Sequence, residues 1–159
     1  MSKDISLMID DVKFNFRVGC IMVYENYVIL EKGLKAKYYV IPGGRVKTLE
    51  DTKSALLREL EEEMHIDFKN KDIKLHHIIE NFFTIDGTKY HEPYFIYKMK
   101  LDDSDEIVKR RKEKLINYDS QGNWYEFIDI QKLDGVNILP VELKKIITSD
   151  NFSTTIVRD

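Results

Sequence analysis

Several features that would mark other classes of protein are missing from this chain of 159 residues. It has one cysteine, Cys20, so no disulfide can form within the chain. Cys20 lies in an apolar run, which favours a buried strand residue over a reactive thiol. No stretch of about 18 apolar residues is present, and Met1 to Asp10 lacks the basic-then-apolar order of a signal peptide. We therefore expect a cytoplasmic protein without a membrane segment.

The chain also lacks an excess of basic residues. Its 25 Lys and Arg residues against 28 Asp and Glu residues leave a net charge of −3, whereas a dedicated nucleic-acid binder is expected to carry a basic face. An acidic protein that binds phosphates needs bound cations or local basic residues. With 43% hydrophobic and 33% charged residues, we expect one folded domain spanning residues 1–159. A homodimer is compatible with this composition.

The first half of the chain predicts strands that lead to a glycine turn. Arg17 to Leu30 has the pattern of a β-hairpin around Glu25-Asn26. Tyr38 to Ile41 is a short strand that runs into Pro42-Gly43-Gly44, where we expect regular structure to end.

The second half predicts another hairpin, formed by His77 to Ile85 and Thr88 to Leu101 around Asp86-Gly87. Pro93 suggests that the returning strand is at an edge or has a bulge. Asp102 to Asn123 is predicted to be a mobile loop, with a helical turn around Ile107 to Leu115. Trp124 to Ile128 is predicted as the last strand, and Val141 to Ile147 as a C-terminal helix. This order predicts an α+β fold with helices packed on a mixed sheet.

One helix is predicted between the hairpins, at Thr52 to Met64, with Asp51 as its N-cap. Its apolar stripe consists of Leu56, Leu57, Leu60 and Met64. Its carboxylate cluster consists of Glu59, Glu62 and Glu63, which share one face because residues three and four apart are neighbours on a helix.

This cluster conflicts with the local physics of a helix. Like charges at these spacings destabilise an isolated helix, and the C-terminal end of the helix dipole prefers cations. Such conflicts more often mark function, and Mg²⁺ would resolve this one because it binds carboxylate oxygens and shares them with phosphates. The three glutamates alone favour a solvated acidic face, but the preceding glycines, Glu50 and the Arg58-Glu59 pair favour a site.

The segment Gly44 to Ile66 resembles the Nudix box. That motif is a glycine, five residues, Glu, seven residues, and then Arg-Glu-apolar-x-Glu-Glu-x-Gly-apolar. The matching residues are Gly44, Glu50, Arg58, Glu59, Leu60, Glu62, Glu63 and Ile66. His65 replaces the last glycine, and we expect it to serve as a left-handed C-cap at small cost. The resemblance implies a Nudix-like α/β/α sandwich.

The resemblance also implies roles for the residues of the box. Glu59, Glu62 and Glu63 would bind Mg²⁺, for which Mn²⁺ could substitute, and Gly43 would add its carbonyl oxygen. Glu59 is alternatively the base that deprotonates the attacking water. Arg58 would orient the glutamates, and Glu50 would support the loop. Such ions lower the pKa of bound water and neutralise pyrophosphate charge.

Residues outside the box are less constrained by the sequence. Many Nudix enzymes take a further acid from a later loop, for which the candidates are Glu92, Asp105, Glu106, Glu113 and Asp119. Two segments are expected to face each other across the second hairpin, Asn81-Phe82-Phe83 and Tyr90-His91-Glu92. They could line a pocket that stacks on a base, or Phe82 or Phe83 could be part of the core. The candidate phosphate contacts are Arg17, Lys35, Lys37 and Arg45. A solvated surface position is the favoured alternative for each of them except Arg45, which lies beside the glycines.

Together these patterns favour an enzyme that hydrolyses a phosphoanhydride bond in a nucleoside diphosphate linked to another moiety. Nucleoside triphosphates, ADP-ribose, nucleotide sugars, dinucleoside polyphosphates and capped RNA ends all remain open as substrates. The rival is a Nudix-like nucleotide-binding or regulatory module without catalysis, which would usually lack some carboxylates of the box. A structural α/β domain with an acidic helix is the third alternative.

Overall fold

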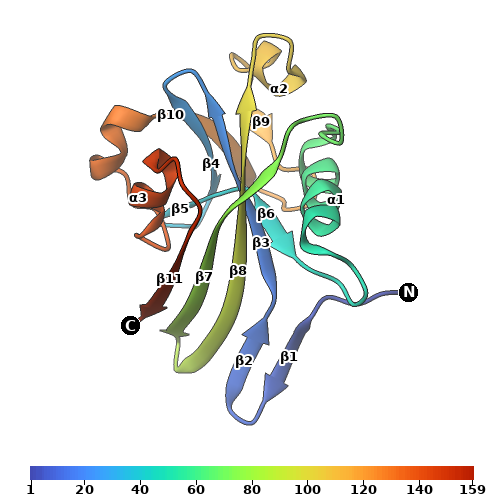
Figure 1. The fold of residues 1–159 in the computed structure, drawn as a ribbon, viewed down its shortest axis with the longest axis vertical. Helices are drawn as coiled ribbons and strands as arrows, with labels where there is room; N and C mark the ends of the chain where they lie inside the picture. Colours follow the sequence, from blue (N-terminus) through green and yellow to red (C-terminus); the bar gives the residue numbers. More distant parts are fainter.

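The computed structural model describes residues 1–159 and consists mainly of strands (Figure 1). The strands are β1 (Ser6–Ile9), β2 (Val12–Asn15), β3 (Arg17–Tyr24), β4 (Tyr27–Gly33), β5 (Tyr39–Val40), β6 (Gly43–Arg45), β7 (Lys74–Ile85), β8 (Thr88–Leu101), β9 (Leu115–Ile116), β10 (Asn123–Asp129) and β11 (Ser153–Arg158). The helices are α1 (Thr52–Met64), α2 (Glu106–Lys109), α3 (Leu143–Thr148) and the 3₁₀ helix η1 (Ile130–Gly135). None of these helices is long and apolar enough to span a bilayer.

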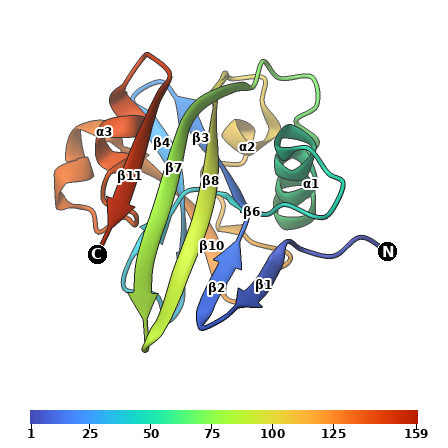
Figure 2. The same cartoon turned by 60° about the horizontal axis from the view of Figure 1, so that its bottom comes forward.

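The strands form one mixed sheet in the order β1-β2-β8-β3-β4-β10-β9, with β7 and β11 pairing in turn beyond β8. Strand β8 runs parallel to β3 and antiparallel to β7. Helix α1 lies on one side of the sheet, and α3 lies on the other (Figures 1 and 2). The structure therefore confirms the predicted α+β class, with helices on both faces of a mixed sheet.

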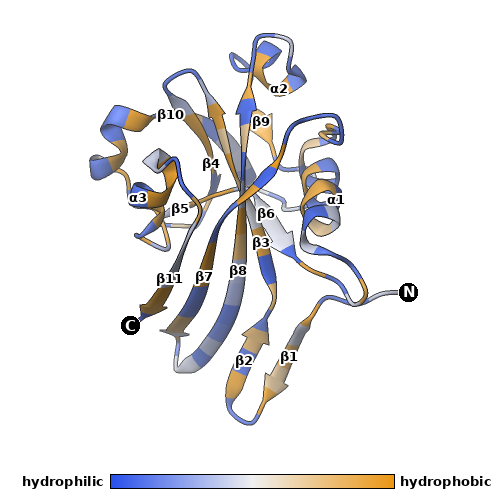
Figure 3. Cartoon of the chain, in the orientation of Figure 1, coloured by the Kyte–Doolittle hydropathy of each residue, from blue (hydrophilic) through white to orange (hydrophobic).

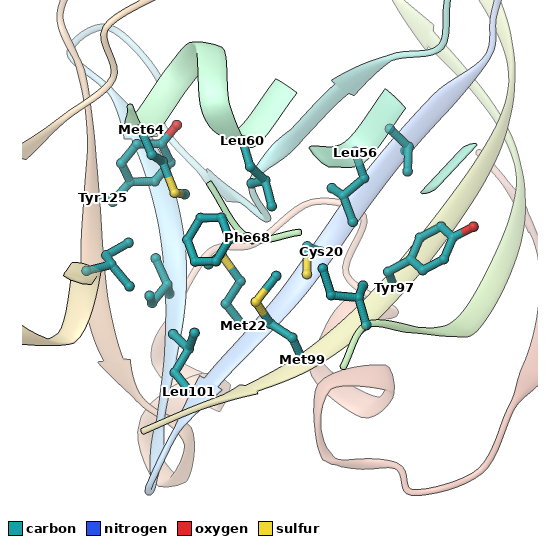
Figure 4. Close-up of a cluster of buried hydrophobic side chains, with 14 of the residues drawn as sticks. Cys20, Met22, Leu56, Leu60, Met64, Phe68, Tyr97, Met99, Leu101 and Tyr125 are labelled. Atoms are coloured by element: carbon teal, nitrogen blue, oxygen red, sulfur yellow. The ribbon is translucent and has the colours of Figure 1, made fainter. Parts of the chain in front are cut away.

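Each face of the sheet has its own hydrophobic core, because successive side chains of a strand point to opposite faces. On β3, Cys20 and Met22 belong to the core beneath α1, whereas Ile21 belongs to the core beneath α3. Figure 4 shows Leu56 and Leu60 of α1 above Cys20 and Met22. Cys20 is fully buried, as predicted, and burial raises the pKa of its thiol.

Helix α1 is amphipathic and begins and ends at the predicted residues (Figure 3). The Asp51 carboxylate accepts a hydrogen bond from the Ser54 backbone N–H at 2.9 Å, which confirms the N-cap. Both predicted hairpins are also present, as β3–β4 and β7–β8, and Asp86 and Gly87 both have positive φ in the second turn.

Two predictions about the strands were wrong. Strand β5 does end before Pro42, but Gly43 and Gly44 are themselves in regular structure, because they form β6 with Arg45 and pair with β3. Strand β8 is not an edge strand, and the bulge of this hairpin lies at Leu75 and His77. Pro93 falls between the ladder of β2, which ends at His91, and that of β3, which begins at Tyr94, so a residue without an N–H is tolerated there.

The ends of the chain also differ from the prediction. Strand β10 is not the last, since β11 follows α3 and runs parallel to β7. The N-terminal hairpin β1–β2 and helix η1 were not predicted. In the segment from Asp102 to Asn123, helix α2 overlaps the predicted helical turn, whereas strand β9 was not predicted. These elements are short, which leaves little local pattern, and β11 pairs with a strand that is distant in sequence.

Candidate functional site: a glutamate cleft beside an aromatic pocket

A polar cleft of about 520 Å³, here called the glutamate cleft, lies where α1 meets β4 and β6. Its lining residues are Asp4, Arg17, Glu31, Val40, Gly43, Gly44, Arg45, Lys47, Arg58, Glu59, Glu62, Glu63, Asp119, Ser120 and Asn123. The structure thus brings together Gly43, Arg58 and all three helix glutamates. Glu50 does not line the cleft but contacts Arg58 behind it.

Arg58 organises one side of this cleft. Its guanidinium donates to both carboxylate oxygens of Glu50, at 2.7 and 3.0 Å, and to Glu59 at 2.9 Å. It also donates to the Arg45 carbonyl oxygen at 2.9 Å and, more weakly, to Glu62 at 3.3 Å. The contact with Arg58 lowers the pKa of the Glu50 carboxyl group. This geometry is what an orienting role for Arg58 requires.

The two glycines allow α1 and β6 to approach each other closely. A Cβ atom on Gly44 would lie 2.2 Å from Cδ of Glu59 and 2.4 and 2.6 Å from its carboxylate oxygens. A Cβ atom on Gly43 would lie 2.1 Å from the Val18 carbonyl oxygen. Any larger residue at position 44 would push the Glu59 carboxylate out of its place, so the glycine is required by the site.

Glu63 is the most perturbed acid of the cleft. It is 7% exposed, and the Tyr125 hydroxyl donates to it at 3.1 Å. Burial, and then the nearby charge of Glu31, raises the pKa of Glu63 to about 8. The pKa of Glu59 is also raised by burial, although Arg58 opposes this shift. A cation in the cleft would favour the ionised forms of both groups.

Glu31 is a cleft residue that the sequence patterns did not identify. It is 7% exposed and accepts hydrogen bonds from the side-chain amides of Asn117 at 3.0 Å and Asn123 at 2.8 Å. The available signal was strand alternation, because Ile29 and Glu31 are two residues apart on β4 and so point to the α1 side of the sheet.

The donor set of the cleft has the chemistry of a magnesium site. It offers carboxylate oxygens from Glu59, Glu62, Glu63 and Glu31, with the backbone of Gly43 at the same cleft. No three of these acids converge closely enough to make a preformed metal site. Like charges repel, and Arg58 holds Glu59 and Glu62, so an ion would have to draw these side chains together.

The acidic candidates outside the box are widely separated. Asp119 lines the glutamate cleft. Glu92 is buried elsewhere, and Asp105 forms an ion pair with Lys71 at 2.8 Å. Glu106 and Glu113 are exposed and do not line the cleft. Among the basic candidates, Arg17 and Arg45 line the cleft, whereas Lys35 and Lys37 do not.

A second cavity of about 600 Å³, here called the aromatic pocket, adjoins the glutamate cleft and shares Arg17, Val40 and Arg45 with it. Its other lining residues are Asn15, Tyr38, Asn81, Phe82, Phe83, Thr84, Ile85, Tyr90, Glu92, Tyr94, Leu139, Pro140, Val141, Glu142, Val157, Arg158 and Asp159. The expected facing of the hairpin residues is confirmed by the register, in which Asn81 is opposite Glu92 and Phe83 is opposite Tyr90.

Phe82, Phe83 and Tyr90, near the turn of this hairpin, lie in neither hydrophobic core. The Phe82 ring contacts the His91 ring, at 4.5 Å between centroids, and the Arg158 guanidinium, at 4.2 Å. Phe83 stacks on Tyr90 at 4.8 Å. The core alternative for these two phenylalanines is therefore wrong, and they form a wall of the pocket.

The structure is thus an α+β fold, a mixed sheet between helices, with a glycine-led acidic helix at a polar cleft. The family model described as the NUDIX domain matches residues 13–142, and the chain therefore belongs to the Nudix hydrolase family. A comparison with curated proteins gave no match.

Solved structures share the fold at low sequence identity. The MutT protein from Bacillus halodurans is 18% identical with a TM-score of 0.66, over 91% of this chain and 90% of that one. The MutT protein from Methanosarcina mazei is 16% identical with a TM-score of 0.58, over 88% and 94%. The Ap4A hydrolase of C. elegans is 16% identical with a TM-score of 0.57, over 84% and 93%. At these identities the comparison supports the fold alone.

Proposed function

We propose that this protein is a Mg²⁺-dependent hydrolase of a phosphoanhydride bond in a nucleoside diphosphate linked to another moiety, with Mn²⁺ able to replace Mg²⁺. The substrate class includes nucleoside triphosphates, ADP-ribose and nucleotide sugars. We further propose that residues 1–159 form one catalytic domain. The observation that carries the proposal is the glutamate cleft, in which acids at the Nudix-box positions meet Arg58 and the two glycines.

In this proposal each residue of the cleft has a separate role in hydrolysis. Bound Mg²⁺ would neutralise the pyrophosphate and supply hydroxide near neutral pH. Glu62 and Glu63 would hold the ion, and Glu59 would either join them or take the proton of the attacking water. Arg58 keeps Glu59 in place while it contacts Glu50. The products are a nucleoside monophosphate and a second phosphate-containing compound.

The two cavities suit the two parts of such a substrate. Arg17 and Arg45 lie on adjacent strands, directly opposite each other in the register, and line both cavities. A phosphate chain between them would reach the glutamates at one end and leave the nucleoside in the aromatic pocket. Guanidinium groups suit this position because they bind phosphate oxygens in a bidentate manner.

The rival function is a nucleotide-binding or regulatory module without catalysis. It is disfavoured because every acidic position of the Nudix box is retained and because Glu59 and Glu63 are buried at a cleft rather than spread over a solvated face. A purely structural role would leave these buried charges without a purpose, since burying a carboxylate is costly unless it is compensated.

A substrate panel tests the proposal. Purified protein is incubated with Mg²⁺ and nucleoside triphosphates, ADP-ribose, nucleotide sugars or dinucleoside polyphosphates, and phosphate and pyrophosphate release are measured separately. We expect turnover of at least one substrate, its loss in excess chelator and its return with Mg²⁺. Glu61→Gln, at an exposed position of α1 outside the cleft, serves as the matched control for Glu62→Gln. Full turnover in excess chelator would overturn the mechanism.

A further inference from the structure

Two buried carboxylates of the glutamate cleft have no cationic partner within the chain. The neighbouring acids Glu59 and Glu62 each form an ion pair with Arg58, at 2.9 and 3.3 Å. Glu31 and Glu63 form no ion pair, although both line the cleft and each is only 7% exposed. Burying a carboxylate is costly unless another charge compensates it, so the cleft lacks positive charge at these two residues.

Glu31 and Glu63 lie close together although they belong to different elements. Tyr125 of β10 is directly opposite Glu31 of β4 in the antiparallel register, so both side chains point to the α1 side of the sheet. The hydroxyl group of Tyr125 donates to Oε2 of Glu63, on α1, at 3.1 Å. One side chain is therefore a neighbour of both carboxylates.

Each of these two carboxylates has one oxygen anchored by neutral donors. The amide groups of Asn117 and Asn123 both donate to Oε1 of Glu31, at 3.0 and 2.8 Å, and Tyr125 donates to Oε2 of Glu63. The remaining oxygens, Oε2 of Glu31 and Oε1 of Glu63, accept no direct hydrogen bond and are not sealed from the cleft. Neutral donors fix the side chains without compensating their charge, which leaves one oxygen of each for a bound cation.

We propose that Glu31 is a metal ligand of the glutamate cleft and that a divalent cation is held between Glu31 and Glu63. This inference rests on the proposed function, to which it adds a ligand from outside the box motif. Because Arg58 already compensates Glu59 and Glu62, a cation relieves most repulsion beside Glu31 and Glu63. Mg²⁺ suits this position because it takes oxygen ligands and keeps several waters, so it needs few carboxylates from the protein.

The binding of Mn²⁺, which stands in for Mg²⁺ and is detected by electron paramagnetic resonance, tests the proposal without any substrate. Glu31→Gln keeps the size of the side chain and an oxygen for the two asparagine amides, but it removes the charge. Loss of a group that only supports a metal ligand costs about 10- to 100-fold in affinity, so we expect the Mn²⁺ dissociation constant to rise by at least about 10-fold. Glu31→Asp keeps the charge and should bind Mn²⁺ more tightly than Glu31→Gln.

Glu92→Gln is the matched control for this measurement. Glu92 is also 7% exposed on a strand and also accepts from an asparagine amide, that of Asn15 at 2.7 Å, but it does not line the glutamate cleft. The control should bind Mn²⁺ with the wild-type dissociation constant. In chelator, the thermal midpoint of Glu31→Gln should be at least that of wild type, because a neutral residue cannot repel Glu63. Weaker binding would then not be the result of unfolding.

A count of the waters on bound Mn²⁺ distinguishes a metal ligand from a residue that only orients Glu63. Water fills a coordination position that a removed ligand vacates. At saturating Mn²⁺, Glu31→Ala should therefore increase the relaxation rate of water protons per bound ion relative to wild type. An unchanged relaxation rate would show that Glu31 does not coordinate the ion.

The outcomes separate this inference from the proposed function. If Mn²⁺ affinity is unchanged in Glu31→Gln but lost in Glu63→Gln, the assignment of Glu31 is overturned and the hydrolase proposal stands. Glu31-dependent Mn²⁺ binding by a protein that turns over no substrate would support the assignment and overturn the hydrolase proposal. Equal affinities in wild type, Glu31→Gln and Glu63→Gln would overturn both, because the cleft would then hold no cation.

Discussion

The ring of His65 lies parallel to the ring of Tyr118, with 3.8 Å between their centroids and 8° between their planes. His65 ends α1 in the left-handed conformation, with φ 56° and ψ 37°, and its backbone N–H donates to the Glu61 carbonyl oxygen at 2.9 Å. The Tyr118 N–H donates to the Glu63 carbonyl oxygen at 2.8 Å. The residue that departs from the box motif therefore joins the end of the acidic helix to the loop that carries Asp119.

Replacing His65 with glycine tests whether this residue is only structural. Glycine would relieve the left-handed conformation but would lose the stack on Tyr118, and each effect is about 1 kcal/mol. We expect His65→Gly to change the unfolding free energy by no more than about 1 kcal/mol and to keep turnover within a few-fold. Denaturant unfolding and steady-state kinetics measure both. A hundredfold slower variant of unchanged stability would assign His65 a direct role in the site.

Gly44→Ala should damage the site by a purely steric route. The new Cβ atom would lie 2.2 Å from Cδ of Glu59, so the carboxylate must move. Displacing a reacting group by about 1 Å costs roughly 100-fold in rate, and we expect a loss of that order in kcat. Gly135→Ala is the matched control because a Cβ atom there has no heavy atom within 4 Å. Equal kcat values for both variants would mean that the position of Glu59 is unimportant.

The sequence predicted those parts of the molecule whose signals are local. The N-cap Asp51, the periodicity of α1 and the Asp86-Gly87 turn each act within a few residues, and the structure confirms all three. The box motif predicted that the helix glutamates and Arg58 share one site, and these residues line the same cleft. Glu31 was not predicted as a residue of the cleft, because its position there depends on hydrogen bonds from Asn117 and Asn123, which are 86 and 92 residues away in the chain. Non-local contacts of this kind leave no local pattern.

The raised pKa of Glu63 predicts how the metal-free protein responds to pH. Between its ordinary value of 4.5 and about 8, the folded state keeps a proton on Glu63 that the unfolded state has released. The folded state then binds more protons, so this group makes stability fall as pH rises through that window. His76 and His77 act in the opposite direction, because burial lowers their pKa values and stability is gained as pH rises toward 6.5.

The contribution of Glu63 is isolated by comparing the wild type with Glu63→Gln, since both proteins contain the two histidines. In the presence of chelator, the thermal midpoint of the variant relative to wild type should rise steadily from pH 5 to pH 8. A difference that is flat over this range would mean that Glu63 titrates at its ordinary value and that neither its burial nor Glu31 perturbs it.

Glu63→Gln also separates catalysis from folding. Glutamine keeps the size of the side chain and an oxygen that can accept from the Tyr125 hydroxyl, but it is always neutral, whereas Glu63 is disfavoured as an ion by its burial and by Glu31. Without metal at pH 7.5 the variant should therefore be as stable as wild type or more stable. Its turnover should nevertheless fall by orders of magnitude, because the loss of a metal ligand removes charge stabilisation from the transition state.

The effect of Mg²⁺ on the thermal midpoint distinguishes a metal site from a solvated acidic face. A ligand that binds only the folded state stabilises it, so Mg²⁺ should raise the wild-type midpoint more than that of Glu63→Gln. Glu61→Gln removes the same charge from an exposed position of α1 and should respond to Mg²⁺ like wild type. A solvated acidic face would make the two variants behave alike, with equal rates and equal midpoints in Mg²⁺, because a diffuse ion atmosphere does not depend on which glutamate is removed. If Glu63→Gln matches Glu61→Gln in both measurements, the glutamate cleft is not a metal site and the proposed mechanism fails with it.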